Sequence, residues 1–136
     1  MSISKNSAGT SRVLKIMVVD DEATVGLVLA RTLDALGHRC FVYPTAQLAW
    51  KAFSDGQGDI DLLITDMQMP GMSGLELLQA VRVKNSRLPV IVMSGSVHQD
   101  DRDGAMEAGA NCFLPKPLSG EDLEVAISAI FATPTN

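Results

Sequence analysis

The sequence lacks the features that mark membrane, secreted and nucleotide-binding proteins. Its 136 residues contain no apolar run near the roughly 20 residues that a membrane helix needs. The first twelve residues, MSISKNSAGTSR, have no apolar segment, so we predict no secretory signal and a cytoplasmic location. No GxxxxGK[ST] sequence is present, which excludes a nucleotide-binding P-loop.

Basic residues and cysteines are also scarce. The chain has 11 Lys and Arg against 16 Asp and Glu, for a formal net charge of −5. Nucleic-acid phosphates are bound by clusters of cations, so we expect no direct nucleic-acid binding by this chain. The two cysteines, Cys40 and Cys112, lie far apart without metal-ligand spacing. We interpret them as small buried apolar residues rather than a disulfide.

Short apolar runs alternate with amphipathic segments along most of the chain. Strands are predicted at 14–19, 39–43, 59–65, 88–94 and 111–114, and helices at 24–37, 45–56, 73–84, 98–109 and 119–131. This alternation predicts an α/β fold of the flavodoxin-like, doubly wound (βα)5 type. Its five-stranded parallel sheet should have the order 2-1-3-4-5, with helices on both faces. We expect one domain over 13–131 with flexible tails at 1–12 and 132–136.

The helical segments carry further local predictions. Helical spacing in 24–37 predicts an inward face made of Val25, Val28, Leu29, Leu33 and Leu36. Thr45 and Ser119 have the side chains expected of N-caps. The segment 98–109 is polar, with chiefly Ala105 and Met106 as apolar anchors. Moving this helix should therefore cost little free energy.

Polar residues follow the predicted strands at the points where they end. Asp20 and Asp21 come directly after the first apolar run, in IMVVDDE, and Asp66 follows the third. Ser94 ends the fourth strand and Lys116 follows the fifth. Ligands of such folds bind at the carboxyl ends of the strands, near the switch point of the sheet. These side chains should therefore converge on one crevice.

A cluster of three carboxylates is electrostatically unfavourable unless something compensates their charge. At about 4–5 Å they repel one another by several kcal/mol per pair at a protein-like dielectric. A bound cation removes this cost, and an all-oxygen ligand set suits Mg²⁺, or Mn²⁺. Metal, lysine and carboxylate together suit phosphoryl transfer, with Asp66 as a nucleophile that forms an acyl phosphate. In the alternative interpretation, Asp20 begins a loop and Asp21 caps the next helix.

Four segments carry a family resemblance. VVDDE, ITDMQMPGMSG, VMSGS and FLPKP, in this order and at strand ends, resemble the receiver domain of two-component response regulators. The resemblance covers roughly residues 13–131 and implies that Asp66 is the phosphoacceptor. It implies that Asp21 and Asp66 ligate Mg²⁺ directly and that Asp20 acts through water. The backbone carbonyl of Gln68 would supply a further ligand.

The resemblance also assigns roles around the phosphoryl group. Ser94 and Lys116 would bind the phosphoryl oxygens, and the Lys116–Pro117 peptide bond would be cis. Ser94 and Phe113 would be the switch residues, although Phe113 also suits an ordinary buried strand position. Ser94 stands where the family more often has threonine, and Phe113 where tyrosine is frequent. Since phenylalanine has no hydroxyl, its part in a switch must come from ring packing.

The function implied by the resemblance is a signalling switch rather than an enzyme. The phosphoryl group would come from a sensor histidine kinase or a phosphotransfer protein, and the chemistry would be self-phosphorylation with slow autodephosphorylation. The output would be a downstream protein target or a fused output domain, with the chain a monomer or a phosphorylation-dependent dimer. The sequence leaves open whether this is a stand-alone receiver or part of a longer regulator or hybrid kinase.

Two other functions share parts of this residue pattern. A phosphatase of the haloacid-dehalogenase type also uses an aspartate nucleophile, Mg²⁺ and a lysine. That family has a second acid two residues after its nucleophile on the first strand. Here Asp20 is followed by Asp21 and Glu22, and Asp66 by Met67 and Gln68, and the chain lacks a cap domain to enclose a substrate. A flavodoxin-type module would bind phosphate through amides and hydroxyls after the first strand, where this chain has the acidic DDEAT.

Overall fold

One parallel sheet in the order β2-β1-β3-β4-β5 organises the molecule, which confirms the predicted topology. The structure is a computed structural model that describes residues 13–56, 59–96 and 98–132. The predicted tail 1–12 and residues 133–136 lie outside the described residues. The strands are β1 (Lys15–Val19), β2 (Arg39–Tyr43), β3 (Leu62–Asp66), β4 (Val90–Ser94) and β5 (Cys112–Pro115). The helices are α1 (Ala23–Ala35), α2 (Ala46–Ser54), α3 (Gly74–Lys84), α4 (Gln99–Glu107) and α5 (Gly120–Phe131).

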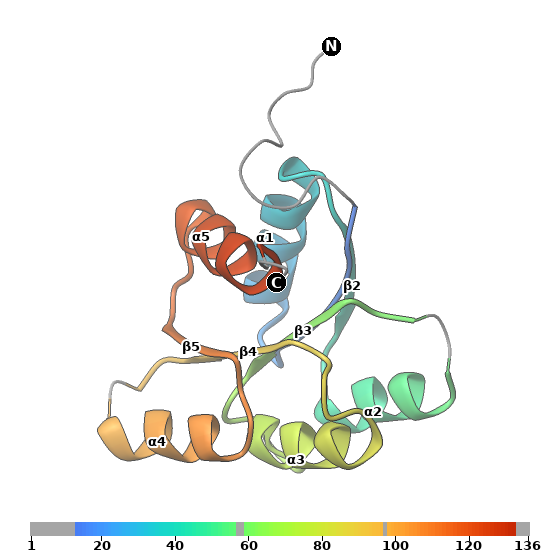
Figure 1. Ribbon diagram of the computed structural model, residues 1–136, viewed down its shortest axis with the longest axis vertical. Helices are drawn as coiled ribbons and strands as arrows, with labels where there is room; N and C mark the ends of the chain where they lie inside the picture. The colour runs from blue at the N-terminus through green and yellow to red at the C-terminus, as the bar shows by residue number, and fades with distance from the viewer. Residues whose placement is uncertain (1–12, 57–58, 97, 133–136) are drawn as a thin grey trace.

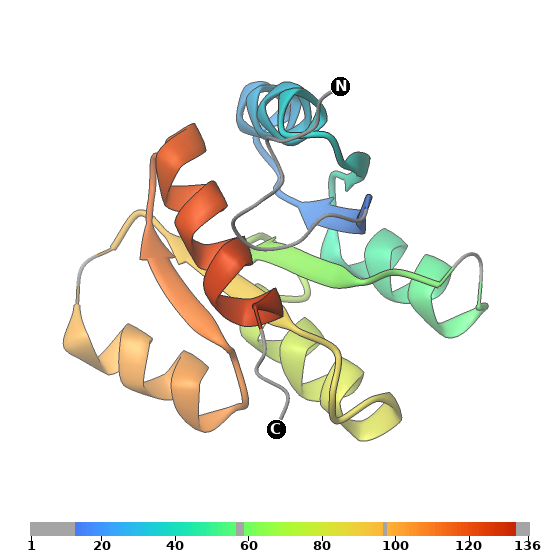
Figure 2. The ribbon, with the colours of Figure 1, turned by 45° about the horizontal axis from the view of Figure 1, so that its top comes forward.

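The sheet separates two apolar cores because successive strand residues point to opposite faces. In β1, Ile16 and Val18 pack toward α1 and α5, whereas Met17 and Val19 pack toward α2 and α3. Figure 1 shows α1 and α5 on one face, and α2, α3 and α4 on the other. Figure 2 shows α1 and α5 again on the same side of the strands. Strands β1, β3 and β4 are covered on both faces, which explains their apolar runs at 16–19, 62–64 and 90–93.

The predicted helix starts are confirmed where a side chain caps the helix. Thr45 accepts a hydrogen bond from the Leu48 backbone nitrogen at 3.1 Å. Ser119 and Asp122 form a reciprocal capping box at the start of α5. Within the described ranges, no helix is long and apolar enough to cross a membrane.

Some local predictions were wrong. Val28, expected inside, is 52% exposed, because α1 buries the stripe made by Gly26, Leu29 and Leu33. Strand β3 begins at Leu62 rather than at residue 59.

Met106 is 40% exposed, so of the two expected anchors of α4 only Ala105 is fully buried. Cys40 and Cys112 are free, as expected, but half-buried. Burial raises the pKa of the Cys40 thiol to about 11, so this cysteine remains protonated at neutral pH.

Candidate functional site

The carboxyl ends of the strands bring three acids together. Asp20 directly follows β1, and Asp66 is the last residue of β3. Since the two strands are neighbours in parallel register, their ends meet at the same edge of the sheet. One carboxylate oxygen from each of Asp20, Asp21 and Asp66 lies within 4.8 Å of the others. The structure therefore places the predicted acidic residues in one cluster.

Asp20 and Asp21 have different surroundings. Asp20 is 1% exposed, and its Oδ1 accepts a hydrogen bond from the Glu22 backbone nitrogen at 2.8 Å. Its buried Oδ2 accepts no hydrogen bond from the described residues, although Lys116 Nζ lies 3.1 Å away as an ion pair. Asp21 is exposed. The N-cap of α1 is Glu22, without a side-chain capping bond, so the interpretation of Asp21 as a helix cap is wrong.

Lys116 carries the positive charge of the cluster. Its Nζ lies 3.2 Å from Asp66 Oδ2 and 3.3 Å from Glu22 Oε1, in addition to the contact with Asp20. Burial lowers the pKa of Lys116, but its close contacts with the charged Asp20 and Asp66 carboxylates outweigh burial and raise the pKa above its usual value. The side chain therefore remains an ammonium at neutral pH. Its backbone nitrogen donates to the Ser94 carbonyl oxygen at 2.8 Å, which holds this loop against β4.

The surroundings of Asp66 disfavour the ionised form of its carboxyl group. Burial raises the pKa of its carboxyl, and the charge of Asp20 adds to that rise. Lys116 and the backbone N–H of Gln68 act in the opposite direction, so burial outweighs the lysine contact. The side chain is 9% exposed. Further positive charge in the cluster would therefore stabilise the ionised form of Asp66.

The donor set fits a hard divalent cation. All candidate ligand atoms are carboxylate or carbonyl oxygens, which suits Mg²⁺ better than zinc. Asp20 Oδ2 is buried and pairs with Lys116 without a well-aligned hydrogen bond, so it keeps acceptor capacity for a cation or its water shell. One lysine against three clustered acids and Glu22 leaves the site with excess negative charge. Gln68 is exposed beside the cluster, where its backbone carbonyl remains a candidate ligand.

Ser94 places a hydroxyl at the same edge of the sheet. The residue is 2% exposed and ends β4 beside β3. Its Oγ accepts a hydrogen bond from the Ser96 backbone nitrogen at 3.0 Å. A hydroxyl has one proton to donate as well as lone pairs to accept. Ser94 can therefore donate to an incoming anion while Ser96 holds its oxygen in place.

Comparison with known proteins gives the family of the chain. The family model described as the response regulator receiver domain matches residues 16–128. This chain belongs to the response regulator receiver family. It is therefore a signalling domain of two-component systems, and no comparison supports the phosphatase interpretation.

Individual relatives agree with this assignment. The chain is 32% identical over 117 residues to the transcriptional regulatory protein RprY of Bacteroides fragilis, covering 86% of this chain and 49% of that protein. It is 32% identical over 115 residues to the DNA-binding transcriptional regulator NtrC of Escherichia coli, covering 85% of this chain and 24% of that protein. A receiver domain structure from Clostridium thermocellum superposes with a TM-score of 0.82 at 30% identity, covering 88% and 94% of the two chains. The receiver domain thus spans half or less of these two curated relatives.

Phe113, which we predicted as a switch residue, is a buried ring of strand β5. It is 8% exposed and packs in the core on the side of α2, α3 and α4. The guanidinium of Arg102, in α4, lies 6.0 Å from the centre of the ring. This contact is worth about 0.5–1 kcal/mol at an accessible site. It connects α4 to the strand that leads to Lys116. The Lys116–Pro117 peptide bond is cis.

Two residues beside the acidic cluster were not predicted from sequence to contact the site. Gly74, the first residue of α3, donates from its backbone nitrogen to the Met67 carbonyl oxygen at 2.9 Å. A Cβ at this position would collide with the carbonyl oxygen of Asp66, so glycine is required for this close approach. The second is Glu22, which contacts Lys116. GMSG before a helical pattern could have indicated the first residue, but no local pattern indicates the second.

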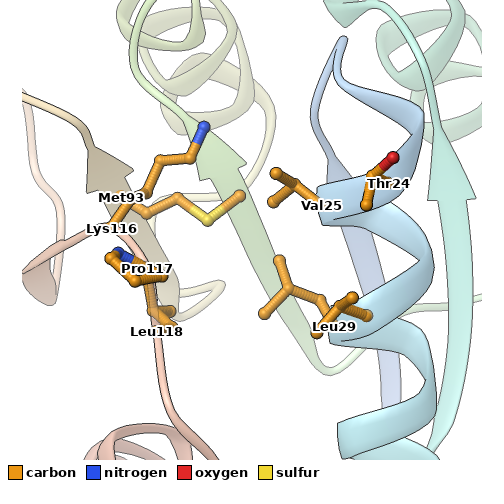
Figure 3. Close-up of a pocket in the computed structure, with 8 residues that line it drawn as sticks. Thr24, Val25, Leu29, Met93, Lys116, Pro117 and Leu118 are labelled. Carbon is orange, nitrogen blue, oxygen red and sulfur yellow. The ribbon is translucent and has the colours of Figure 1, made fainter.

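An apolar pocket of about 340 Å³ adjoins the acidic cluster of the receiver domain. It lies between α1 and the segment from Lys116 to Leu118, with Val25, Leu29 and Met93 among its walls. Figure 3 shows that the Lys116 nitrogen points away from Pro117 and Leu118, so the pocket contacts the lysine stem. The pocket is therefore chemically distinct from the acidic cluster.

Proposed function

We propose that this receiver domain is a phosphorylation-dependent switch that accepts a phosphoryl group on Asp66. The donor is a sensor histidine kinase or a phosphotransfer protein. The observation that supports this most is the position of Asp66, buried at the end of the central strand between two acids and Lys116. A carboxylate in this setting shares a candidate metal site with Asp20 and Asp21 and has the Lys116 ammonium 3.2 Å away.

The residues of the chain divide the chemistry among them. A carboxylate oxygen of Asp66 attacks the phosphorus of the donor, forming an acyl phosphate while the bond from phosphorus to the donor nitrogen breaks. Lys116 and the Ser94 hydroxyl donate hydrogen bonds to the transferred phosphoryl oxygens. Asp21, Asp66 and the Gln68 carbonyl would hold Mg²⁺, with Asp20 acting through water. When bound, Mg²⁺ (or Mn²⁺) would supply charge neutralisation and alignment for the transfer.

The wider assignment is also a proposal. We take the domain as residues 13–131, a range that contains the family match at 16–128. It would act in the cytoplasm on a downstream protein target or on a fused output domain. The chain itself would bind no nucleic acid, and it would be a monomer or a phosphorylation-dependent dimer.

The switch needs more than one new contact. A hydrogen bond from Ser94 to a charged phosphoryl group is worth about 1.5–3 kcal/mol. Moving a two-state equilibrium from 1:99 to 99:1 requires about 5.5 kcal/mol. Either Ser94 and Lys116 act together with repacking of Phe113, or the inactive state is only slightly favoured before phosphorylation. The polar helix α4, whose fully buried residue is Ala105, is the element that costs least to move.

Phosphorylation by acetyl phosphate tests the proposed chemistry. We expect the wild-type chain to gain the mass of one phosphoryl group when Mg²⁺ and acetyl phosphate are present, and no gain when EDTA is added. Asp66→Ala should gain none under either condition, because it lacks the nucleophile. Intact-protein mass spectrometry gives the result. Equal labelling of both proteins, or labelling in EDTA, would contradict the proposal.

Beryllofluoride, a phosphoryl mimic, tests the proposed output face. We expect amide chemical shifts to change in α4, β5 and the start of α5 as well as in the loops after Asp66 and Ser94. The distant change is expected because Phe113, on the strand that leads to Lys116, contacts Arg102 of α4. Two-dimensional NMR of the labelled domain measures it. A response confined to the two loops would show that this switch mechanism is wrong, even if phosphorylation occurs.

A further inference from the structure

Glu22 is the N-cap residue of α1, but its side chain makes no capping hydrogen bond. Side chains at N-caps usually accept from the helix amides. The Glu22 carboxylate instead accepts from Lys116 Nζ at 3.3 Å, across 94 residues of sequence. Its backbone nitrogen meanwhile donates to Asp20 Oδ1 at 2.8 Å. Glu22 thus contacts both the buried acid of the cluster and its lysine.

The Lys116 ammonium has three N–H donors and three carboxylate neighbours within 3.3 Å. Two of these neighbours are buried, since the side chains of Asp20 and Asp66 are 0% and 9% exposed. The Glu22 side chain is 63% exposed. An exposed ion pair contributes little, whereas a buried carboxylate that loses its cation is strongly destabilised. Of the three contacts, the one with Glu22 is the least costly to break.

We propose that Glu22 is a positioning residue that holds Lys116 while Asp66 is unphosphorylated and gives it up to the phosphoryl group. The inference rests on the proposed role of Asp66 as phosphoacceptor. A new phosphoryl oxygen needs a hydrogen bond from Lys116. If the phosphoryl oxygen replaces Glu22 as the acceptor, both buried aspartates keep their contact with the ammonium. Glu22 also adds negative charge beside the path of an anionic donor, so it restrains phosphorylation.

Replacing Glu22 by glutamine should speed phosphorylation by acetyl phosphate at saturating Mg²⁺. The expected increase is about two- to fivefold at low ionic strength, the range given by the loss of an exposed ion pair. The increase should shrink as salt is added, because exposed charges are screened. In ¹H–¹⁵N spectra of the Lys116 amino group, the variant should show a shifted signal before phosphorylation and the wild-type signal after it.

Two further variants test whether Glu22 acts through its contact with Lys116 or through its charge alone. Asp34→Asn changes the net charge equally at an exposed position near the far end of α1, and it should phosphorylate at the wild-type rate. Glu22→Asp keeps the charge but shortens the side chain and weakens the contact with Lys116, so its rate should lie between those of wild type and Glu22→Gln. If Glu22→Gln and Asp34→Asn have the same rate and salt dependence while Asp66 is phosphorylated, the inference is overturned and the proposed function stands. If wild type is not phosphorylated at Asp66, the proposed function itself fails.

Discussion

Replacing Lys116 by methionine is expected to destabilise the fold by about 3 kcal/mol in EDTA, near the lower end for breaking a buried ion pair. Methionine keeps the apolar stem and removes the charge that faces Asp20 and Asp66 at 3.1 and 3.2 Å. Those two carboxylates would then repel each other without a cation between them. Urea unfolding, followed by circular dichroism at pH 7, measures the free energy of unfolding.

Mg²⁺ should reverse most of this loss. A ligand at 100 times its dissociation constant stabilises the folded state by about 2.7 kcal/mol. Without Lys116, the acids have no competing cation, so the variant should bind Mg²⁺ more tightly than wild type. Lys51→Met is the matched control, since Lys51 pairs with Asp55 at the surface. It should lose less than about 1 kcal/mol and show the wild-type response to Mg²⁺.

The loss should also depend on pH. Burial raises the pKa of Asp66, and Lys116 opposes that rise, so the pKa of Asp66 should rise further in the variant. An acid with a raised pKa in the folded state favours folding below its unfolded pKa of 3.8, and this contribution is lost as the pH rises through the folded pKa. The destabilisation of Lys116→Met should therefore be largest at neutral pH and smaller near pH 4. A Mg²⁺-independent and pH-independent loss would contradict the electrostatic account.

Gly74→Ala is expected to damage both the fold and the phosphorylation reaction. The new Cβ would meet the backbone carbonyl of Asp66 and lie 3.0 Å from Met67 Cα. These are backbone atoms, so relief requires moving the start of α3 away from the end of β3. We expect a destabilisation of about 3 kcal/mol, the upper end for overpacking. A displacement of Asp66 by about 1 Å can slow phosphorylation about 100-fold.

Gly104→Ala provides the control for this substitution. A Cβ at Gly104 has no heavy atom within 4 Å, and the residue lies inside helix α4. Alanine there should stabilise the domain by about 0.5–1 kcal/mol, because glycine is a poor helix former. Thermal unfolding and acetyl phosphate kinetics compare the two variants. If Gly74→Ala had wild-type stability and rate, the close approach of α3 to Asp66 would not matter for the site.

The strand order and the meeting of Asp20, Asp66 and Lys116 could be predicted from sequence. Both follow from alternating apolar patterns and from one rule, that parallel strands end at the same edge of a sheet. The exposure of Val28 could not be predicted, because the buried stripe of α1 depends on where its neighbours pack. Gly26 lies against Val42, which turns this stripe away from Val28.

The contacts around Lys116 show another limit of sequence reasoning. The residue type indicates a cation near the acids, but not which carboxylates it reaches. Its contact with Glu22 depends on the exact direction of two long side chains, one from the N-cap of α1 and one from the loop after β5. The same holds for Gly74, where the need for glycine appears once the distance from α3 to the Asp66 carbonyl is known. Interactions of this kind require the three-dimensional arrangement.

Locating the acyl phosphate among three neighbouring acids tests the central claim most directly. Borohydride reduces an aspartyl phosphate to homoserine, which marks the modified residue permanently. After phosphorylation with acetyl phosphate and Mg²⁺, reduction and peptide mapping by mass spectrometry should place homoserine at position 66 and leave Asp20 and Asp21 unchanged. Homoserine at position 20 or 21, or at none of the three, would contradict the assignment of Asp66 as phosphoacceptor.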